Sequence, residues 1–183
     1  MPGRRSSRPW PRRSARGSRL VGAPNLFPTP QEIARRLVEL ADIRLGHRVL
    51  EPSEGTGSLV RASRETCPEA DITAVEINPQ LAAALTGMVQ RCESADFLAI
   101  GEDLGDFDRI VMNPPFGRGA DIDHIKGSFA LLAPGGRLVA VCANGPRQRE
   151  ELGEVGTTWI DLPAGAFQEQ GTGVNTAIVV LDN

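Results

Sequence analysis

The residues Asn113-Pro114-Pro115-Phe116 combine a side-chain amide, two imino acids and an aromatic ring in an order that suits chemistry on an amino group. Proline lacks a backbone N–H and fixes its own φ, and it restricts the preceding residue to extended dihedrals. We therefore expect Asn113 to be held rigidly, with its side-chain oxygen and the neighbouring carbonyls acting as acceptors. Two N–H bonds accepted by fixed oxygens would draw an amine lone pair out of conjugation, and Phe116 could stack on the ring that carries the amine.

Three apolar residues at 110–112 precede this tetrapeptide and predict a strand buried on both faces of a parallel sheet. Because the prolines cannot continue the ladder of backbone hydrogen bonds, the chain must leave the sheet at Asn113. The motif is thus expected at the carboxyl end of a strand, where open α/β sheets bind their ligands. A Pro-Pro pair that merely ends a strand is the alternative interpretation.

A glycine-containing loop, residues 51–57, lies between a predicted strand at 48–50 and a predicted helix at 59–67. Its glycines permit positive φ and a close approach of the backbone, and the amides at a helix start face whatever lies in such a loop. Val60 stands where the dinucleotide fingerprint has its third glycine, which argues against a nicotinamide or flavin cofactor.

An acidic residue, Glu76, ends the next predicted strand at 71–75. It lies 21 residues after Gly55, the spacing at which a doubly wound sheet brings a carboxylate to a ribose diol. Asn78 and Pro79 then predict the start of a helix that extends to Gln90. A solvated surface glutamate is the alternative for Glu76.

In this setting the Asn-Pro-Pro-Phe sequence resembles motif IV of the class I S-adenosylmethionine-dependent amino-methyltransferases, above all the N6-adenine DNA methyltransferases. The glycine loop resembles motif I of the same family, with Glu51 where the family has Asp or Glu. Glu54 departs from the small residue common at its position. The resemblance implies that Asn113, Pro114, Pro115 and Phe116 are catalytic. It implies that the cofactor is bound by Phe27, Thr29, Pro30, Glu51, Pro52, Gly55, Gly57, Glu76, Ile77, Asp96, Phe97 and Asn113.

Two of these assignments compete with simpler local explanations. The segment 27–30 resembles motif X, which lies over the methionine end of the cofactor, but Thr29 also predicts the N-cap of a helix with a capping box to Glu32. Asp96 and Phe97 resemble the adenine-binding position, whose carboxylate accepts the exocyclic amine. An N-cap or a solvated aspartate is the alternative for Asp96.

The alternation of strands and helices predicts a largely parallel sheet with helices on both faces. The resemblance covers residues 26–181 and implies an α/β, Rossmann-like, seven-stranded and mostly parallel sheet with one antiparallel strand. Later strands are predicted at 138–141, 159–162 and 176–181, after a helix that buries Ile122, Ile125, Phe129 and Leu132. We expect the loop that holds Phe167, Gln168 and Thr172 to wall the substrate pocket; turn chemistry alone is the alternative.

The composition fits one α/β domain of 183 residues, of which 40% are hydrophobic. No apolar run long enough to span a membrane and no secretory signal is seen, so we expect a cytoplasmic protein, as a monomer that does not associate with membranes. The three cysteines and two histidines lack the spacings of zinc sites or disulfide frameworks, and we expect no metal. Phosphate-loop, zinc-protease and serine-hydrolase motifs are also missing.

The first nineteen residues hold seven arginines and no acidic residue. Since the whole chain has net charge −3 and this stretch contributes +7, the remainder carries −10. We expect residues 1–24 to be a disordered, arginine-rich tail and residues 25–183 to form the methyltransferase domain. The tail is either an arm that binds phosphates or a reflection of the chain's general preference for arginine over lysine.

The resemblance implies methyl transfer from S-adenosyl-L-methionine to an exocyclic amine, with N6 of adenine in DNA as the leading expectation. Guanine N2 or adenine N6 of RNA and the side-chain amide of a protein glutamine are alternatives within the class. A non-catalytic module that binds the cofactor or nucleic acid is the alternative outside it. Because the predicted loops are short and two residues follow Leu181, we expect no target-recognition domain, and specificity would then need the arm or a partner.

Overall fold

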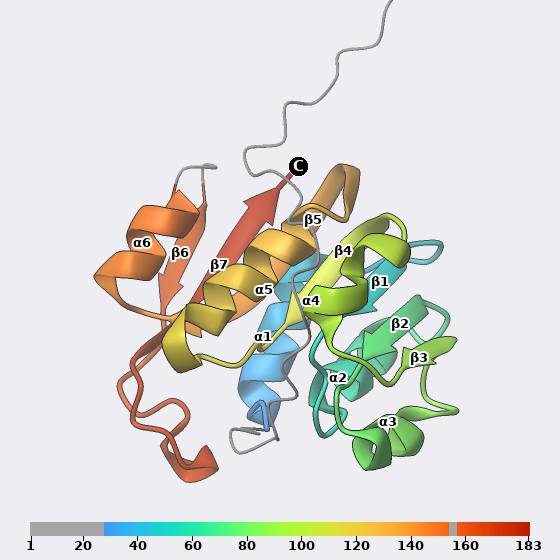
Figure 1. The fold of residues 1–183 in the computed structure, drawn as a ribbon, viewed down its shortest axis with the longest axis horizontal. Helices are drawn as coiled ribbons and strands as arrows, with labels where there is room; N and C mark the ends of the chain where they lie inside the picture. The colour runs from blue at the N-terminus through green and yellow to red at the C-terminus, as the bar shows by residue number, and fades with distance from the viewer. Residues whose placement is uncertain (1–27, 154–156) are drawn as a thin grey trace, which may run out of the picture.

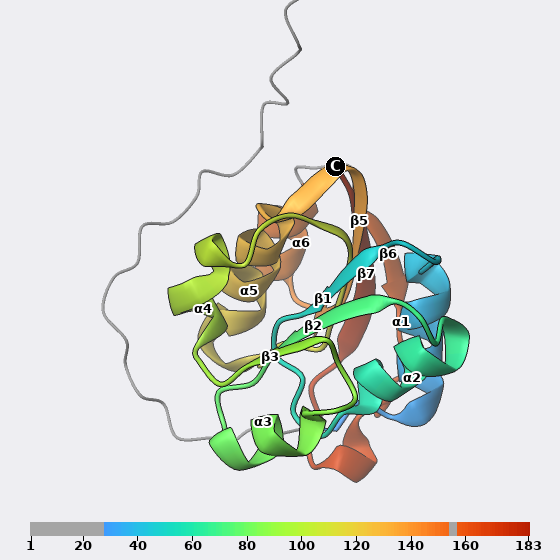
Figure 2. The ribbon, with the colours of Figure 1, turned by 90° about the vertical axis from the view of Figure 1, so that its right-hand side faces the viewer.

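The computed structural model describes residues 28–153 and 157–183, which form a seven-stranded sheet between two layers of helices (Figures 1 and 2). The predicted tail at 1–24 and Phe27 lie outside the described residues. The strand order is β3-β2-β1-β4-β5-β7-β6. The strands are β1 (Arg48–Glu51), β2 (Asp71–Val75), β3 (Arg91–Glu93), β4 (Phe107–Met112), β5 (Leu132–Ala143), β6 (Thr158–Asp161) and β7 (Thr176–Asp182).

All neighbouring strands from β3 to β5 are parallel, whereas β7 is antiparallel to both β5 and β6. The predicted Rossmann-like architecture with one antiparallel strand is thereby confirmed. The order of strands reverses between β1 and β4, which are neighbours with Leu50 opposite Ile110. In an open α/β sheet, the carboxyl ends of the strands at such a reversal form the crevice where ligands bind.

Three helices cover each face of the sheet (Figure 2). One face carries α1 (Gln31–Ala41), α2 (Ser58–Thr66) and α3 (Pro79–Leu85). The other carries α4 (Phe97–Ile100), α5 (Ala120–Phe129) and α6 (Pro146–Leu152). Short 3₁₀ turns are η1 (Gly101–Asp103), η2 (Gly117–Gly119) and η4 (Gln168–Gln170). None of the helices among the described residues is both long and apolar enough to cross a membrane.

Successive residues of β4 are buried in opposite directions, which explains why this strand is apolar without interruption. Ile110 and Met112 belong to the hydrophobic cluster under α5, and Val111 belongs to the cluster under α1. All three are at most 1% exposed. Burying a side chain of this size contributes roughly 1.5–3 kcal/mol. The strand that leads to Asn113 is thus one of the most firmly held elements.

Two predicted helix boundaries were wrong. Helix α3 ends at Leu85 instead of Gln90, because Thr86 is extended and Gly87 has φ 96°. Its buried residues are Ala82 and Leu85. Leu132 is not on a helix but begins β5, where it is fully buried. The apolar spacing from Ile122 continued past the end of α5 because the next strand also needs a buried residue there.

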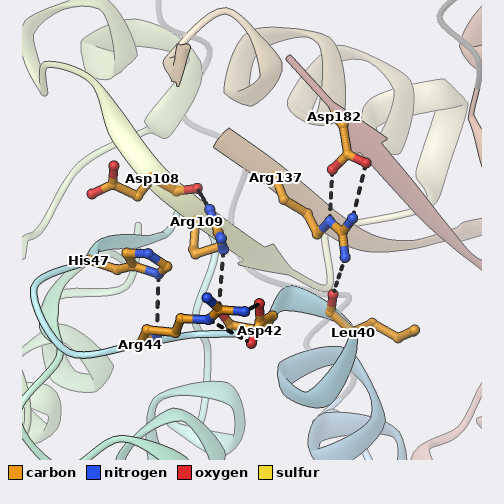
Figure 3. A network of polar contacts seen from close by, with 8 residues as sticks. All are labelled: Leu40, Asp42, Arg44, His47, Asp108, Arg109, Arg137 and Asp182. Atoms are coloured by element: carbon orange, nitrogen blue, oxygen red, sulfur yellow. Dashed lines mark hydrogen bonds and ion pairs between the residues drawn. The ribbon is translucent and has the colours of Figure 1, made fainter. Parts of the chain in front are cut away.

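Polar side chains at the amino ends of the strands are connected by hydrogen bonds and ion pairs (Figure 3). Arg137 donates two hydrogen bonds to the Asp182 carboxylate, at 2.7 and 3.1 Å, and a third to the Leu40 carbonyl at 3.1 Å. Arg109 donates to the carbonyl of Asp42, whose carboxylate pairs with Arg44. Arg137, Arg109 and Arg44 therefore each bond a carboxylate or a carbonyl at this edge.

Candidate active site

The amide of Asn113 is anchored by the segment that leads into α1. Asn113 Nδ2 donates a hydrogen bond of 3.1 Å to Thr29 Oγ1, across 84 residues of sequence. Since the tip of an amide carries one nitrogen and one oxygen, fixing Nδ2 also fixes the direction of Oδ1. Pro114 is buried behind it, and Pro115 is half-buried. The rigidity that the two prolines predicted is thus reinforced by a long-range contact.

The prediction that Thr29 caps α1 was wrong. The helix begins at Gln31 with Pro30 at its N-cap, and no side chain caps it. Thr29 is only 9% exposed, and its hydroxyl instead accepts the hydrogen bond from Asn113. The threonine is therefore a support for the Asn-Pro-Pro-Phe loop.

Phe116 packs against the segment that joins β6 to β7. Its ring lies 6.0 Å from that of Phe167, nearly perpendicular at 87°. Phe167 is fully buried, whereas Phe116 is half-buried and keeps part of its surface accessible. A perpendicular contact of this kind is a favoured arrangement of two aromatic rings. It fixes the orientation of Phe116 beside Asn113.

A cavity of about 550 Å³ lies between the start of α1 and the β6–β7 segment. Its lining residues are Pro30, Gly165, Ala166, Gln168, Glu169 and Gln170. The segment itself extends beyond the lower edge of the sheet in Figure 1. Pro30 follows the threonine that holds Asn113, so the cavity adjoins the support of the Asn-Pro-Pro-Phe loop.

The glycine loop adopts the backbone that only glycine takes without strain. Gly55 has φ 65° and Gly57 has φ 85°. A Cβ on Gly57 would lie 2.8 Å from Arg61 Nη1 and 3.2 Å from Leu85 Cδ2. The loop therefore turns tightly at the start of α2, with its backbone close to neighbouring side chains.

Glu76 is joined to this loop by a hydrogen bond that its spacing from Gly55 did not predict. Gly55 N–H donates to Glu76 Oε2 at 2.7 Å, and Asn78 N–H donates to Oε1 at 2.6 Å. The carboxylate is 5% exposed and held from two sides. Ile77, the next residue, is 41% exposed, an unusual exposure for a large apolar side chain. The end of β2 thus presents a fixed acid beside an accessible apolar surface.

Two further carboxyl groups are buried in the loop. Glu51 is 1% exposed, and only its Oε2 accepts a hydrogen bond, from Ser53 N–H at 3.0 Å. Glu54 is 7% exposed, and neither of its oxygens completes a hydrogen bond of normal geometry. Burial raises the pKa of Glu51 well above its usual range and raises the pKa of Glu54 to about 8. Pro52, between them, is buried.

Asp96 and Phe97 lie at the same edge of the sheet, at the start of α4. Asp96 Oδ1 accepts a hydrogen bond from Leu98 N–H at 3.0 Å and thereby caps the four-residue helix α4. Phe97 is 3% exposed, with its ring 5.9 Å from that of His124. The capping alternative is what this structure contains, and a role in cofactor binding would use the second carboxylate oxygen.

Asp121, a fully buried acid at the start of α5, was not singled out from the sequence. Its Oδ2 accepts hydrogen bonds from Ala143 N–H at 2.9 Å and from Gln148 Nε2 at 3.1 Å. Burial raises its pKa. Asp121 ties the helix that follows the Asn-Pro-Pro-Phe loop to the end of β5 and to α6.

A model of the methyltransferase small domain matches residues 32–158, more than half of the chain. The chain belongs to this methyltransferase family. It is a class I S-adenosylmethionine-dependent methyltransferase by family and fold, and S-adenosyl-L-methionine is its cofactor, which confirms the predicted fold family and cofactor. Among the described residues no group of three or more His, Cys, Asp or Glu side chains is arranged to hold a metal ion.

Relatives of this methyltransferase have several substrates in their names. A demethylmenaquinone methyltransferase of Thermus thermophilus is 32% identical over 114 residues, covering 58% of this chain and 52% of the relative. A tRNA (guanine(6)-N2)-methyltransferase of the same organism is 31% identical over 151 residues, covering 72% and 42%. This chain therefore spans about half the length of these relatives.

A solved structure with the same fold is a modification subunit of a proposed type I restriction enzyme from Vibrio vulnificus YJ016. Its TM-score is 0.69 at 23% identity, over 88% of this chain and 45% of that one. The likeness concerns the fold.

The residues at the reversal point fit the cofactor that the family uses. The loop offers a tight glycine turn, a fixed carboxylate at Glu76 and buried carboxyl oxygens without hydrogen bonds at Glu51 and Glu54. S-adenosylmethionine carries a ribose diol and two positively charged groups. Hydroxyl donors and cations are what such oxygens bind.

Proposed function

We propose that this methyltransferase transfers a methyl group to an exocyclic amino group of a nucleobase, with N6 of adenine in DNA as the first candidate. The observation that carries the proposal is the Asn113 amide, fixed by Thr29 at 3.1 Å at the end of β4 and followed by two prolines. An amide oxygen and a carbonyl without competing N–H donors suit an amino group. They would not suit a hydroxyl or carbon acceptor, which offers at most one N–H or O–H donor.

In this proposal Asn113 Oδ1 and the Pro114 carbonyl accept the two N–H bonds of the substrate amine, and Pro115 keeps the loop rigid. Phe116 stacks on the base, with its orientation fixed by Phe167. The cofactor supplies a methyl group bound to a positively charged sulfur. The chain's own contribution is to orient the amine and hold its lone pair ready. No general base is needed beforehand, since the proton leaves a product nitrogen that is already cationic.

The cofactor-binding roles proposed for the other residues follow their places at the edge of the sheet. Glu76 accepts the ribose hydroxyls, and Ile77 offers its exposed side chain to the adenine ring. Asp96 and Phe97 bound the far side of that ring. Gly55 and Gly57 let the loop approach closely, with Glu51 and Pro52 at its start. Thr29 and Pro30 cover the methionine end, and Phe27, which lies outside the described residues, is given the same role by the resemblance alone.

The cavity supports a flat, polar acceptor. Its volume of about 550 Å³ is of the size that encloses a small ligand, and Gln168 and Gln170 bring amide groups to its lining. Amide side chains can pair with the hydrogen-bonding edge of a base that has left its stack. Extruding a base from a duplex costs a few kcal/mol, and less where the base is already unpaired.

A second candidate is N2 of guanine in RNA. It is favoured by the likeness to a tRNA (guanine(6)-N2)-methyltransferase over 151 residues. An amide oxygen and a carbonyl can hold the amino group of either base, so the clamp at Asn113 does not distinguish them. Contacts of the base with Gln168 and Gln170 would distinguish adenine from guanine.

The arginines of residues 1–19 are proposed to bind the phosphates that the body of the protein, at net charge −10, repels. Each phosphate neutralised contributes about 0.9 to the slope of log K against log salt. Deleting residues 1–19 is expected to flatten this slope for DNA binding. An unchanged slope would exclude a role of residues 1–19 in binding phosphates.

The deciding experiment is transfer of radiolabelled methyl from S-adenosylmethionine to unmethylated duplex DNA, bulk RNA and cell protein in parallel, with nucleoside analysis of labelled nucleic acid. Label in N6-methyladenine of DNA would establish the first candidate, and label in N2-methylguanine of RNA the second. Label in protein glutamine would exclude a nucleobase acceptor. Binding of the cofactor without label in any pool would indicate a non-catalytic module.

A further inference from the structure

Glu51 and Glu54 form a buried pair of carboxyl groups at the start of the glycine loop. They are 1% and 7% exposed, and three of their four oxygens complete no hydrogen bond. The two groups interact directly: Glu54 raises the pKa of Glu51, whereas the side-chain interaction with Glu51 lowers the pKa of Glu54. Two adjacent carboxylates cannot donate to one another, but a single proton shared between them creates a hydrogen bond. Like charges that share a buried site are usually relieved in this way.

The charged groups around the pair do not offset the cost of ionising it in a buried place. Glu76, at the end of β2, adds a further negative charge toward Glu51. Arg61 on α2 favours ionisation of Glu54, as do the Leu59 and Val60 amides at the start of that helix. Burial outweighs them, and the pKa of Glu54 stays near 8. The nearby Cys92 thiol has a raised pKa and carries no charge at neutral pH.

The pair stands beside the position where the methyl group must be delivered. Glu51 ends β1, whose neighbour β4 ends one residue before Asn113. These two strands meet where the order of the sheet reverses. A cofactor whose methyl group reaches an amine at Asn113 therefore brings its positively charged half to the end of β1.

We propose that the buried pair of Glu51 and Glu54 is protonated in the cofactor-free protein and releases a proton when the positively charged methionine half of S-adenosylmethionine binds, so that the pair selects the charged cofactor over its uncharged-sulfur product. Glu54 supplies the second carboxyl group, without which Glu51 has no neighbour in the loop with which to share a proton. The inference rests on the cofactor and not on the identity of the methyl acceptor.

The charges of substrate and product explain the selectivity. S-adenosylmethionine carries a carboxylate, an ammonium and a sulfonium, and its net charge is +1. Methyl transfer breaks the S–CH₃ bond with both electrons left on sulfur, forms the N–CH₃ bond, and leaves an ammonium product that gives its proton to water. S-adenosylhomocysteine has no net charge, so Glu51 and Glu54 regain a proton. By linkage, a ligand that displaces a proton binds more tightly as pH rises toward the pKa of the free pair.

The test is calorimetric titration of the full chain with S-adenosylmethionine and, separately, with S-adenosylhomocysteine, at about pH 6.5 in buffers of different ionisation enthalpy. At this pH the α-ammonium of both ligands, with a pKa near 7.7–8.0, keeps its proton. A neighbouring charge lowers an acid's pKa by about 1–3 units. We therefore expect about 0.2 to 0.9 proton released per S-adenosylmethionine, and markedly fewer for S-adenosylhomocysteine.

Glu54→Gln is expected to abolish this proton release and to reduce the preference for S-adenosylmethionine over S-adenosylhomocysteine by at least about tenfold. Glu54→Ala should behave alike. The matched control is Glu93→Gln, at the end of neighbouring β3, where the carboxylate is half-buried and already paired with Arg91 at 2.8 Å. It should release protons as the unmodified protein does.

Equal proton release for both ligands, no release, or undiminished release in Glu54→Gln would each overturn the inference, as would a failure of both ligands to bind. Proton release that vanishes with Glu54 supports it even where no nucleic acid becomes methylated. Methyl transfer to a nucleobase without proton release would leave the proposed function standing and remove this inference.

Discussion

The two edges of the sheet treat their charged side chains in opposite ways. At the amino ends of the strands, Arg137 makes three hydrogen bonds and Arg44 pairs with Asp42, in the network of Figure 3. At the carboxyl ends, Glu51 and Glu54 are buried with most of their oxygens unbonded. The first edge is largely exposed and electrically satisfied, and the second is buried and unsatisfied.

The difference separates what stabilises the fold from what the fold is built to bind. An exposed ion pair contributes little, but it imposes no penalty. A buried carboxyl without a partner lowers stability and persists where a ligand completes it. The paired edge should therefore respond to substitution through stability alone, and the unpaired edge through binding, rate and pH dependence.

The largest expected effect is a loss of methyl-transfer rate on substitution at the carboxyl ends of the strands. Asn113→Ala should lower the single-turnover rate of methyl transfer by about 10² or more, because it removes a contact that holds the amine in the transition state. Cofactor affinity, measured by calorimetry, should change little. The matched control is Asn144→Ala at the end of β5, whose amide bonds Asp161 at 3.1 Å and takes no part in the proposed chemistry. Turnover by Asn113→Ala at the unmodified rate would contradict the proposal that Asn113 holds the substrate amine.

The next effect concerns stability and its pH dependence. The pKa of Glu54 is about 8 in the fold, against an ordinary value of 4.5 once unfolded. Between these values the unfolded chain holds fewer protons than the fold, so Glu54 makes the protein less stable as pH rises from about 4.5 to 8. Glu54→Gln should thus be more stable than the unmodified protein at about pH 9, by about 1–3 kcal/mol, with the gap closing toward pH 5. Urea denaturation across this range measures the difference in the free energy of unfolding. A less stable variant at high pH would refute the claim that Glu54 is buried without a partner.

A smaller effect compares two glycines of the same conformation. Gly57 has φ 85° in the cofactor loop, and Gly135 has φ 77° at the amino edge with no atom near a would-be Cβ. Alanine at either position should cost about 1 kcal/mol through backbone strain. Only Gly57→Ala should also weaken cofactor binding, since its Cβ displaces Arg61. Calorimetry on both variants checks this, and equal affinities would show that the loop tolerates a side chain.

The smallest effect is expected at the paired edge. Asp182→Asn removes the ion pair with Arg137, in which the aspartate side chain is 61% exposed. The free energy of unfolding should fall by at most about 1 kcal/mol, and by less at high salt. Methyl transfer should be unchanged. A rate loss without a stability loss would mean that the two edges are not separate in function.

The sequence predicted the fold around the site where the signal was local, since proline and glycine marked the ends of β1 and β4. It did not predict the 2.7 Å bond from the Gly55 amide to Glu76, because their spacing was interpreted as a contact of Glu76 with a ribose. It could not predict the contact between Thr29 and Asn113, because a good N-cap residue has the same sequence signature as a buried hydroxyl acceptor.

Burial was likewise beyond the sequence. Glu54 stood out as an unusual residue, but only the packing of the loop against α2 and β2 removes it from water. Asp121 gave no signal, since a helix-start aspartate is ordinarily exposed. The boundary errors at α3 and Leu132 arose where apolar periodicity continued across a turn.

The position of β7 has a consequence for the order in which the protein is made. In the described sheet, β6 pairs with β7 and with no other strand, and β7 itself lies against β5. Since the ribosome releases the chain from its N-terminus at about 5–20 residues per second, β6 emerges before the strand that it needs. The β6–β7 segment, which carries Phe167 to Phe116, can therefore close only after β7 has been translated. During synthesis the glycine loop is complete before the segment that we propose to line the acceptor pocket.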